Sequence, residues 1–280
     1  MHNLFFSEGI HMQYQNFHTH TRYSDGHDTP REMIEEAVNR GFTSLGFSDH
    51  SYAWFESYYS MSQEGTVRQF REIRSLASEY RDKIRIYAGI ELDGESAIPS
   101  LDYDFVLSSV HEAVRHGRSF PIDSGKEQHL ALVRELYGGS YTDFTKDYYM
   151  RLTEHVIRNR TDIVGHLDLP TKYSTCPEDD PRYRDAAVEA IREIVKHCRV
   201  FELNTGAIAR GLRTVPYPAS FLLDEIRSHG GWIMVNSDCH YRAKLSCWFE
   251  EAEDFLTAHG FRKYENQRLN DRIDGVTLWK

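Results

Sequence analysis

The stretch QNFHTHTRYSDGHDTPREMIEEAV, residues 15–38, contains a complete strand, loop and helix. Its first six residues form an apparent strand in which His18 and His20 alternate and therefore point to the same face. Thr29 and Glu32 form a capping box around a proline, which predicts that a helix begins there. A strand followed by a helix is the repeating unit of a parallel sheet.

The same alternation of apolar strands and longer amphipathic segments continues along most of the chain. We expect strands at residues 15–20, 43–47, 84–91, 104–111, 162–167, 200–204 and 232–236. We expect helices at residues 30–40, 66–82, 127–136, 142–158, 182–197, 219–229 and 248–259. The chain has no internal repeat or long linker, so a single closed sheet is more economical than two small domains. The sequence therefore predicts an α/β fold, with a barrel as the favoured form.

Side chains that bind metals recur where the expected strands end. They are His18, His20, Asp25, His50, Glu91, His111, His166, Asp238 and His240. The carboxyl ends of barrel strands meet on one face and carry the active site, so these side chains are expected to converge. Imidazoles and carboxylates together suit zinc, manganese or iron. The pool is too large for one catalytic ion and predicts two to three divalent transition metals, which fits hydrolysis of a phosphate ester.

The remaining histidines and the cysteines are not expected to bind these metals. Cys239 lies between two expected ligands, but strand alternation turns it to the opposite face, so packing is favoured. The spacing of the four cysteines predicts neither a disulfide framework nor a zinc knuckle. Surface or packing positions are expected for His155, His197, His229 and His259, and His11, His27, His116 and His129 lack a strand-end position.

Composition limits the partners of the chain. The formal net charge of −10 argues against nucleic acid, which would require a basic face. No apolar run is long enough to span a membrane, and residues 1–14 lack the features of a secretory signal. We therefore expect a cytoplasmic protein with an N-terminal extension at residues 1–14 and a single domain at residues 15–280. Nothing in the sequence indicates its oligomeric state.

Taken together, these motifs resemble those of the PHP superfamily, named for polymerase and histidinol phosphatase, and specifically its monofunctional histidinol-phosphatase branch. The resemblance covers nearly all of residues 15–270. It is carried by FHTHT at 17–21, SDG at 24–26, TPREMIEEA at 29–37, GFSDHS at 46–51, ELNTG at 202–206 and SDCH at 237–240. It implies a distorted, TIM-barrel-like (β/α)₇ barrel with three metals at the carboxyl ends of the strands, and a hydroxide as the nucleophile.

The resemblance also implies how the ligands are shared among the metals. The first metal would use His18, His20, Glu91 and Asp238. The second would share Glu91 with His111 and His166, and the third would use Asp25, His50 and His240. Within this set Glu91, Asp238 and His240 are expected to act at the reaction centre. Asp25 is the least secure of these ligands, because relatives in the superfamily use another residue type in its loop.

A phosphomonoester requires cations in addition to the metals. Three cationic residues follow expected strands on the catalytic side: Arg210, Arg213 and Lys172. Arg210 is favoured as a phosphate ligand, whereas Arg213 and Lys172 are equally well explained as solvated charges on a loop. The ammonium and imidazole of histidinol phosphate could be bound by Glu112 and Asp123, which could equally be structural. Aromatic residues that could line a rim or pack the loop are Tyr52, Trp54, Phe55, Tyr58 and Tyr59.

The first interpretation is thus a metal-dependent phosphatase that releases L-histidinol and phosphate in histidine biosynthesis. One alternative is a related phosphoesterase acting on a nucleotide phosphate or a phosphotyrosyl protein. A further alternative is a metal-binding regulatory module without turnover, against which the intact set of ligands argues.

Overall fold

The structure, a computed structural model, describes residues 14–54, 58–96 and 98–280. The expected extension, apart from Tyr14, lies outside the described residues, and so do His11 and Phe55. Tyr14, which we had assigned to the extension, is the first residue of strand β1.

The parallel strands expected from the sequence are all present. They are β1 (Tyr14–Asn16), β2 (Phe42–Phe47), β3 (Arg85–Asp93), β4 (Phe105–Ser109), β7 (Ile163–Val164), β8 (Val200–Asn204) and β9 (Trp232–Asn236). They follow one another in this order in a curled sheet, which the C-terminal strands β11 (Val276–Trp279) and β10 (Lys263–Gln267) extend in antiparallel fashion. The α/β, TIM-barrel-like architecture is therefore confirmed.

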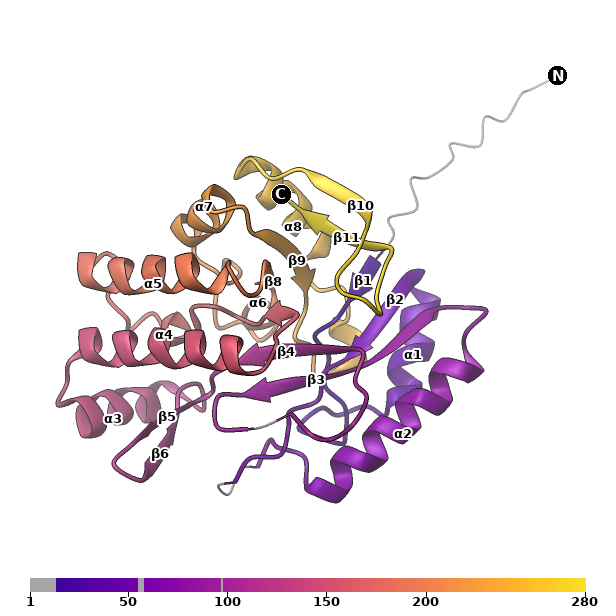
Figure 1. Cartoon of the computed structure of the whole chain (residues 1–280), viewed down its shortest axis with the longest axis horizontal. Helices are drawn as coiled ribbons and strands as arrows, with labels where there is room; N and C mark the ends of the chain where they lie inside the picture. Colours follow the sequence, from indigo (N-terminus) through magenta and orange to yellow (C-terminus); the bar gives the residue numbers. More distant parts are fainter. Residues whose placement is uncertain (1–13, 55–57, 97) are drawn as a thin grey trace.

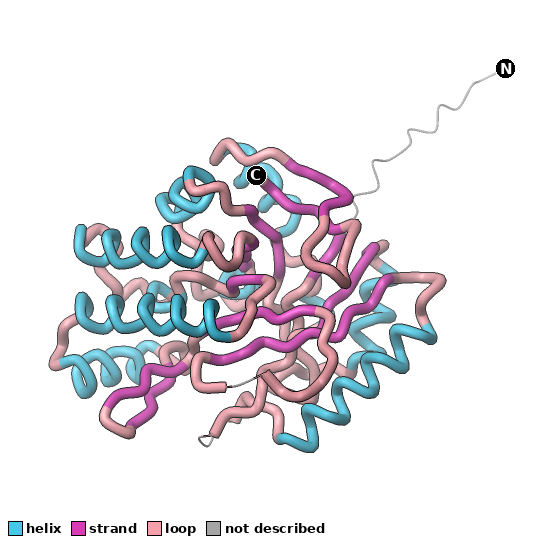
Figure 2. The backbone as a smooth tube through the Cα atoms, viewed as in Figure 1, coloured by secondary structure: helices cyan, strands magenta, loops and turns pink. Residues whose placement is uncertain are grey.

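Helices cover the outside of this sheet (Figure 2). They are α1 (Pro30–Asn39), α2 (Gln63–Glu79), α3 (Lys126–Tyr137), α4 (Tyr141–Arg158), α5 (Pro181–Ile194), α6 (Gly206–Ala209), α7 (Ser220–Ser228) and α8 (Phe249–Ala258). Two 3₁₀ turns, η1 (Leu169–Thr171) and η2 (Arg242–Lys244), follow β7 and β9. Helices α3, α4 and α5 lie side by side on one flank, and α1 and α2 lie on another (Figure 1).

Local signals placed the start of α1 correctly. Thr29 and Glu32 form the predicted capping box, in which the Glu32 carboxylate accepts from the Thr29 backbone N–H at 2.8 Å. Helix α2 instead begins three residues before its predicted start, because the Ser62 hydroxyl accepts from the Gly65 backbone N–H and caps the helix there.

Some elements were not predicted. Residues 112–121 form a hairpin, β5 (Glu112–Arg115) and β6 (Arg118–Pro121), where we expected a loop. The short elements α6, η1 and η2 and the strands β10 and β11 were missed as well. Most of β10 is exposed and polar, so it carries no alternating pattern from which a strand could be inferred. Of the helices in the described residues, none combines the length and the apolar character that crossing a membrane requires.

The parallel strands do not close into a continuous ladder. Strand β9 pairs with β11 on its far side. In the described part of the chain, the β-bridge that joins it to the first strand unit is the isolated Thr19–Cys239 pair at the carboxyl end. Side-chain amides fill the remaining seam. The Asn16 carboxamide donates to the Ser237 hydroxyl at 2.6 Å and to the Leu245 carbonyl at 2.9 Å, and Asn236 accepts from the Phe17 backbone N–H at 2.8 Å.

Aromatic rings fill the interior of the barrel. Phe17 and Phe105 are both buried there, with ring centroids 5.3 Å apart. A Cβ atom at Gly89 would lie 2.2 Å from the Phe105 ring, and one at Gly46 would lie 2.9 Å from both rings. Two neighbouring strands thus lack side chains where these rings need the space. The interior below the candidate site is therefore a packed core.

We predict that Asn16→Ala lowers the free energy of unfolding by at least about 2 kcal/mol, since each buried partner left unpaired costs roughly 1–3 kcal/mol. Urea denaturation of the metal-free protein measures this. Asn39→Ala, at the exposed end of α1, is the control and should change the value by less than about 0.5 kcal/mol. Equal effects of the two substitutions would show that the amide seam does not hold the barrel together.

Candidate metal centre

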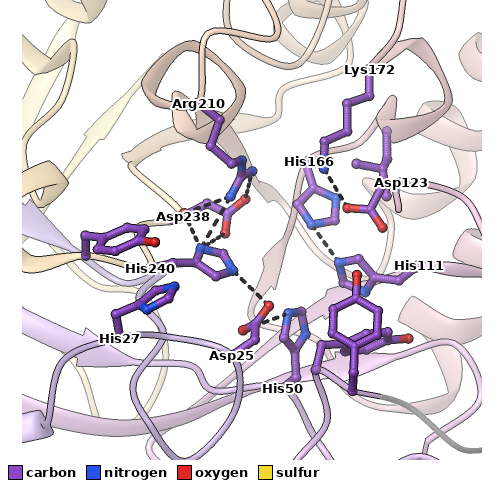
Figure 3. A pocket seen from close by; sticks show the side chains of 14 residues that line it. Asp25, His27, His50, His111, Asp123, His166, Lys172, Arg210, Asp238 and His240 are labelled. Atoms are coloured by element: carbon purple, nitrogen blue, oxygen red, sulfur yellow. Dashed lines mark hydrogen bonds and ion pairs between the residues drawn. The ribbon is translucent and has the colours of Figure 1, made fainter. Parts of the chain in front are cut away.

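The expected ligands converge at the carboxyl ends of the strands. Figure 3 shows Asp25, His50, His111, His166 and Asp238 directed toward one cavity, although they come from separate loops and strand ends. All nine expected ligands belong to four overlapping groups, within each of which the ligand atoms lie within 4.8 Å of one another.

Glu91, at the end region of β3, is the centre of the cluster, and its carboxylate is fully buried. One oxygen, Oε2, faces His50 Nδ1 at 3.0 Å, His18 Nε2 at 3.2 Å and His20 Nε2 at 3.5 Å. The other, Oε1, faces two further imidazoles, with Nε2 of His166 at 3.2 Å and Nε2 of His111 at 3.4 Å. The two oxygens therefore divide the imidazoles into two sets, the geometry required of a carboxylate shared between metals.

Two other carboxylates complete the cluster on one side. Asp238 Oδ1 lies 3.2 Å from His20 Nε2 and 3.6 Å from His18 Nε2. Asp25 Oδ2 lies 3.1 Å from His240 Nε2, and its Oδ1 lies 3.8 Å from His50 Nε2. The grouping of Asp25 with His50 and His240 agrees with the third expected set, but His20 joins that group as well.

Unpaired buried atoms test whether this cluster fits metal ions. Several buried atoms of the cluster make no contact with hydrogen-bond geometry, although some lie 3.0 to 3.5 Å from one another: His18 Nε2, both ring nitrogens of His20, His50 Nδ1, Glu91 Oε2 and Asp25 Oδ1. A buried polar atom without a partner costs roughly 1–3 kcal/mol, so such a concentration would be strongly destabilising unless cations filled it. The residues present therefore fit a group of divalent metals.

The electrostatics of the cluster divide its members. Burial would lower the pKa of His18 and His111, but the neighbouring carboxylates Glu202, Glu91 and Asp93 raise both, that of His111 to about 10, so a metal would displace a proton there. Burial alone would raise the pKa of Glu91, but His18, His50 and His111 hold it well below its usual range. Burial and the neighbouring His240 and His50 lower the pKa of His20 to about 3. An ionised carboxylate and a neutral imidazole are the forms that bind a metal.

Two buried carboxylates that we did not predict orient the imidazoles. Glu202 Oε1 lies 2.7 Å from His18 Nδ1, and Asp93 Oδ2 lies 2.8 Å from His111 Nδ1. In each case the carboxylate contacts Nδ1 of the ring, and Nε2 of the same ring faces Glu91. Carboxylates that support metal-binding imidazoles in this way are common at metal sites. A sequence signal existed for Asp93, since it lies two residues after Glu91 on the same strand and so shares its face.

Three of the five predicted substrate-binding residues line a cavity of about 290 Å³ beside the cluster: Arg210, Lys172 and Asp123. Arg210 Nη2 lies 3.0 Å from Asp238 Oδ2, and Lys172 Nζ lies 2.7 Å from Asp123 Oδ2. Both cations therefore face the cavity while paired with a carboxylate. His27 and Tyr241, which we had not assigned to the site, also line it and stack with ring centroids 4.0 Å apart.

The other two predicted substrate-binding residues, Arg213 and Glu112, are not among the described residues that line this cavity, so the structure does not bring them to it. Arg213 donates to the Thr171 carbonyl at 3.1 Å and lies over the Tyr217 ring at 4.6 Å, so its guanidinium is held between the η1 turn and Tyr217. Glu112 follows His111 and begins the hairpin, where its carboxylate accepts from the Ser119 hydroxyl at 2.6 Å and from the Tyr59 hydroxyl at 3.4 Å.

The residues set aside from the metal set lie mostly where expected. His155 is buried and bonds the Leu92 carbonyl at 2.8 Å, and Cys239 packs in an apolar cluster. All four cysteines are free thiols. Of the aromatic residues after β2, Tyr58 and Tyr59 line the cavity, whereas Tyr52 and Trp54 line a separate, more apolar one.

Comparison with known proteins identifies the family. Residues 16–206 match the family model described as PHP domain, which is more than half of the chain. The chain belongs to the PHP domain family, as its motifs indicated.

Two named relatives and one solved structure resemble this chain over most of its length. A protein named probable histidinol-phosphatase from Deinococcus radiodurans is 27% identical over 247 residues, covering 84% of this chain and 89% of the relative. The histidinol-phosphatase of Lactococcus lactis subsp. lactis is 23% identical over 267 residues, covering 90% and 93%. The crystal structure of the Lactococcus histidinol phosphate phosphatase, a complex with zinc, L-histidinol and phosphate, has the same fold, with a TM-score of 0.68 at 22% identity over 89% of this chain and 95% of that one.

We predict that Glu91→Gln removes most of the bound metal while the fold is retained. The amide cannot hold two cations, although it keeps the size of the carboxylate. Elemental analysis after dialysis measures metal content, and circular dichroism checks the fold. Glu251→Gln on the exposed face of α8 is the matched control. Full metal occupancy in the Glu91 variant would contradict the bridging role.

Proposed function

We propose that this protein is a metal-dependent histidinol-phosphatase, which hydrolyses L-histidinol phosphate to L-histidinol and phosphate in histidine biosynthesis. The observation that carries the proposal is the Glu91 cluster, where five imidazoles lie 3.0 to 3.5 Å from one buried carboxylate beside a cavity with two cationic side chains. The names of the relatives that span most of the chain support the substrate.

Two to three divalent metals would occupy the cluster in this proposal, with Glu91 shared between them. The candidate ligands are His18, His20, Asp25, His50, Glu91, His111, His166, Asp238 and His240. When bound, such metals polarise a phosphoryl group and supply an activated water at neutral pH. Glu202 and Asp93 would hold His18 and His111 in the orientation that their contacts already define.

Recognition of the phosphoryl group is assigned to Arg210 and Lys172. The side chain of Arg210 is about one-third exposed and lines the cavity, and its guanidinium is a planar fork that matches phosphate oxygens. Lys172 is almost fully buried, lines the same cavity and brings a point charge to it. Together they would neutralise an anion in a region where Glu91, Asp238 and Asp123 would otherwise repel it.

The ammonium of the substrate is assigned to Asp123. Its carboxylate lines the cavity and is about one-quarter exposed, so it can accept a second cation besides Lys172. Burial would raise the pKa of Asp123, but Lys172 and His111 hold it well below its usual range, which keeps it ionised. The cytoplasmic location, the lack of nucleic-acid and membrane partners, and the choice among zinc, manganese and iron remain predictions from the sequence.

Phosphate release from purified protein tests the proposed function. We expect histidinol phosphate to be hydrolysed with a higher kcat/KM than a nucleoside monophosphate or phosphotyrosine, and the preparation to contain two to three metal equivalents. Glu91→Gln should lower turnover by orders of magnitude. A higher kcat/KM for one of the other substrates would identify that class, and not histidinol phosphate, as the substrate. Absence of turnover in fully metallated protein would favour the regulatory module.

Arg210→Ala should lower kcat/KM for histidinol phosphate by about one to two orders of magnitude, since charge-assisted hydrogen bonds contribute roughly 1.5–3 kcal/mol each. Steady-state kinetics and metal content are measured together. Arg213→Ala is the matched control on the same loop, and it should retain wild-type kinetics because its side chain contacts Thr171 and Tyr217. A loss of metal in Arg210→Ala would mean that it acts by holding Asp238.

A further inference from the structure

Asp25 differs from the other candidate ligands in that a loop carries it well beyond the end of its strand. It follows β1 by nine residues, since that strand ends at Asn16. The ladder of the sheet therefore cannot determine where its carboxylate lies. Something else must hold residues 21–26 in the conformation that brings Asp25 Oδ2 within 3.1 Å of His240 Nε2.

Asp49 supplies that anchor. Its side chain is fully buried behind the cluster, and its Oδ1 accepts from the Thr21 backbone N–H at 2.7 Å and from the Ser24 hydroxyl at 2.6 Å. Its Oδ2 accepts from the Thr21 hydroxyl at 2.9 Å and from the Gln69 amide at 3.1 Å. One carboxylate thus holds both the first residue of the loop and the residue immediately before Asp25.

The loop then folds tightly around these anchored residues. The Gly26 backbone N–H donates to the Thr21 carbonyl at 2.9 Å, and a Cβ atom at Gly26 would lie 2.4 Å from the His20 carbonyl carbon. The His27 backbone N–H donates to the His240 carbonyl at 2.8 Å. Asp25 therefore lies between two fixed ends, one held by Asp49 and the other by the strand end that carries His240.

Asp49 also connects the loop to the rest of the cluster. Its backbone carbonyl accepts from the Glu91 backbone N–H at 3.2 Å, and the next residue is His50. Its bonding differs from that of Glu202 and Asp93, which contact imidazole nitrogens directly. The side chain of Asp49 instead bonds the loop, so its influence should be directed at Asp25.

We propose that Asp49 is the positioning residue for Asp25, and that it selectively sets the metal affinity of the group formed by Asp25, His50, His240 and His20. The inference rests on the proposed metal centre. Asp49→Asn keeps the size of the side chain but replaces one acceptor oxygen with a donor, so it cannot accept all of the present bonds. We expect the affinity of that one site to fall 10- to 100-fold, the range seen when outer partners of metal ligands are changed.

The experiment compares metal content and chelator competition for the wild type, Asp25→Ala, Asp49→Asn and the double variant. Asp25→Ala should lose about one metal equivalent. Asp49→Asn should lose the same equivalent at limiting free metal, and the double variant should lose no more than Asp25→Ala alone, because both changes act on one site. Ser24→Ala, which removes a single bond to Asp49, should give a smaller shift in the same direction and serves if Asp49→Asn does not fold.

Asp162→Asn is the matched control for loss of a buried carboxylate. Asp162 lies at the opposite end of the sheet, where it accepts from the Val106 backbone N–H at 2.8 Å and the Asn270 amide at 3.0 Å. This variant should lower stability and leave metal content unchanged. A wild-type metal count in Asp49→Asn, or an additional loss in the double variant, would overturn the role of Asp49. Wild-type protein without transition metal would instead overturn the metal centre itself.

Discussion

The contact between one buried carboxylate and five imidazoles is the constraint on which the rest of the structure depends. Glu91 has no access to solvent, and an isolated buried charge would be too costly to maintain. Strand ends that are far apart in sequence must therefore deliver cationic or metal-bound partners to it. The curled parallel sheet is the arrangement that brings those ends to one place.

The two ends of the barrel have separate tasks. At the amino end, β11 pairs with β9 and provides the C-terminal part of the chain with a place in the sheet. Rings such as Phe105 fill the interior, and side-chain amides such as Asn16 replace the missing ladder between the first and last parallel strands. The carboxyl end, which the Thr19–Cys239 bridge and the Asn16 amide join together, holds the polar groups that would destabilise a core.

Charge pairing also shapes the cavity. Each cation on its wall, Arg210 and Lys172, already contacts a carboxylate, Asp238 or Asp123. An isolated cation near the metals would be repelled, whereas a paired one is held in place and still offers donors to an anion. The same pairs offer a carboxylate to an ammonium group, which supports the proposal that the cavity binds a phosphate ester that also carries an ammonium group.

The sequence by itself determined the parallel strands, most helices and the convergence of the candidate ligands, because strand alternation, capping and the position of a residue at a strand end are local properties. It did not determine which loop side chains reach the cavity. Arg213 and Arg210 lie three residues apart, yet only Arg210 lines the cavity, since Tyr217 and Thr171 engage the other. The roles of Asp49 and the amide seam depend on partners brought together by folding across long sequence separations, and only the tertiary structure decided them.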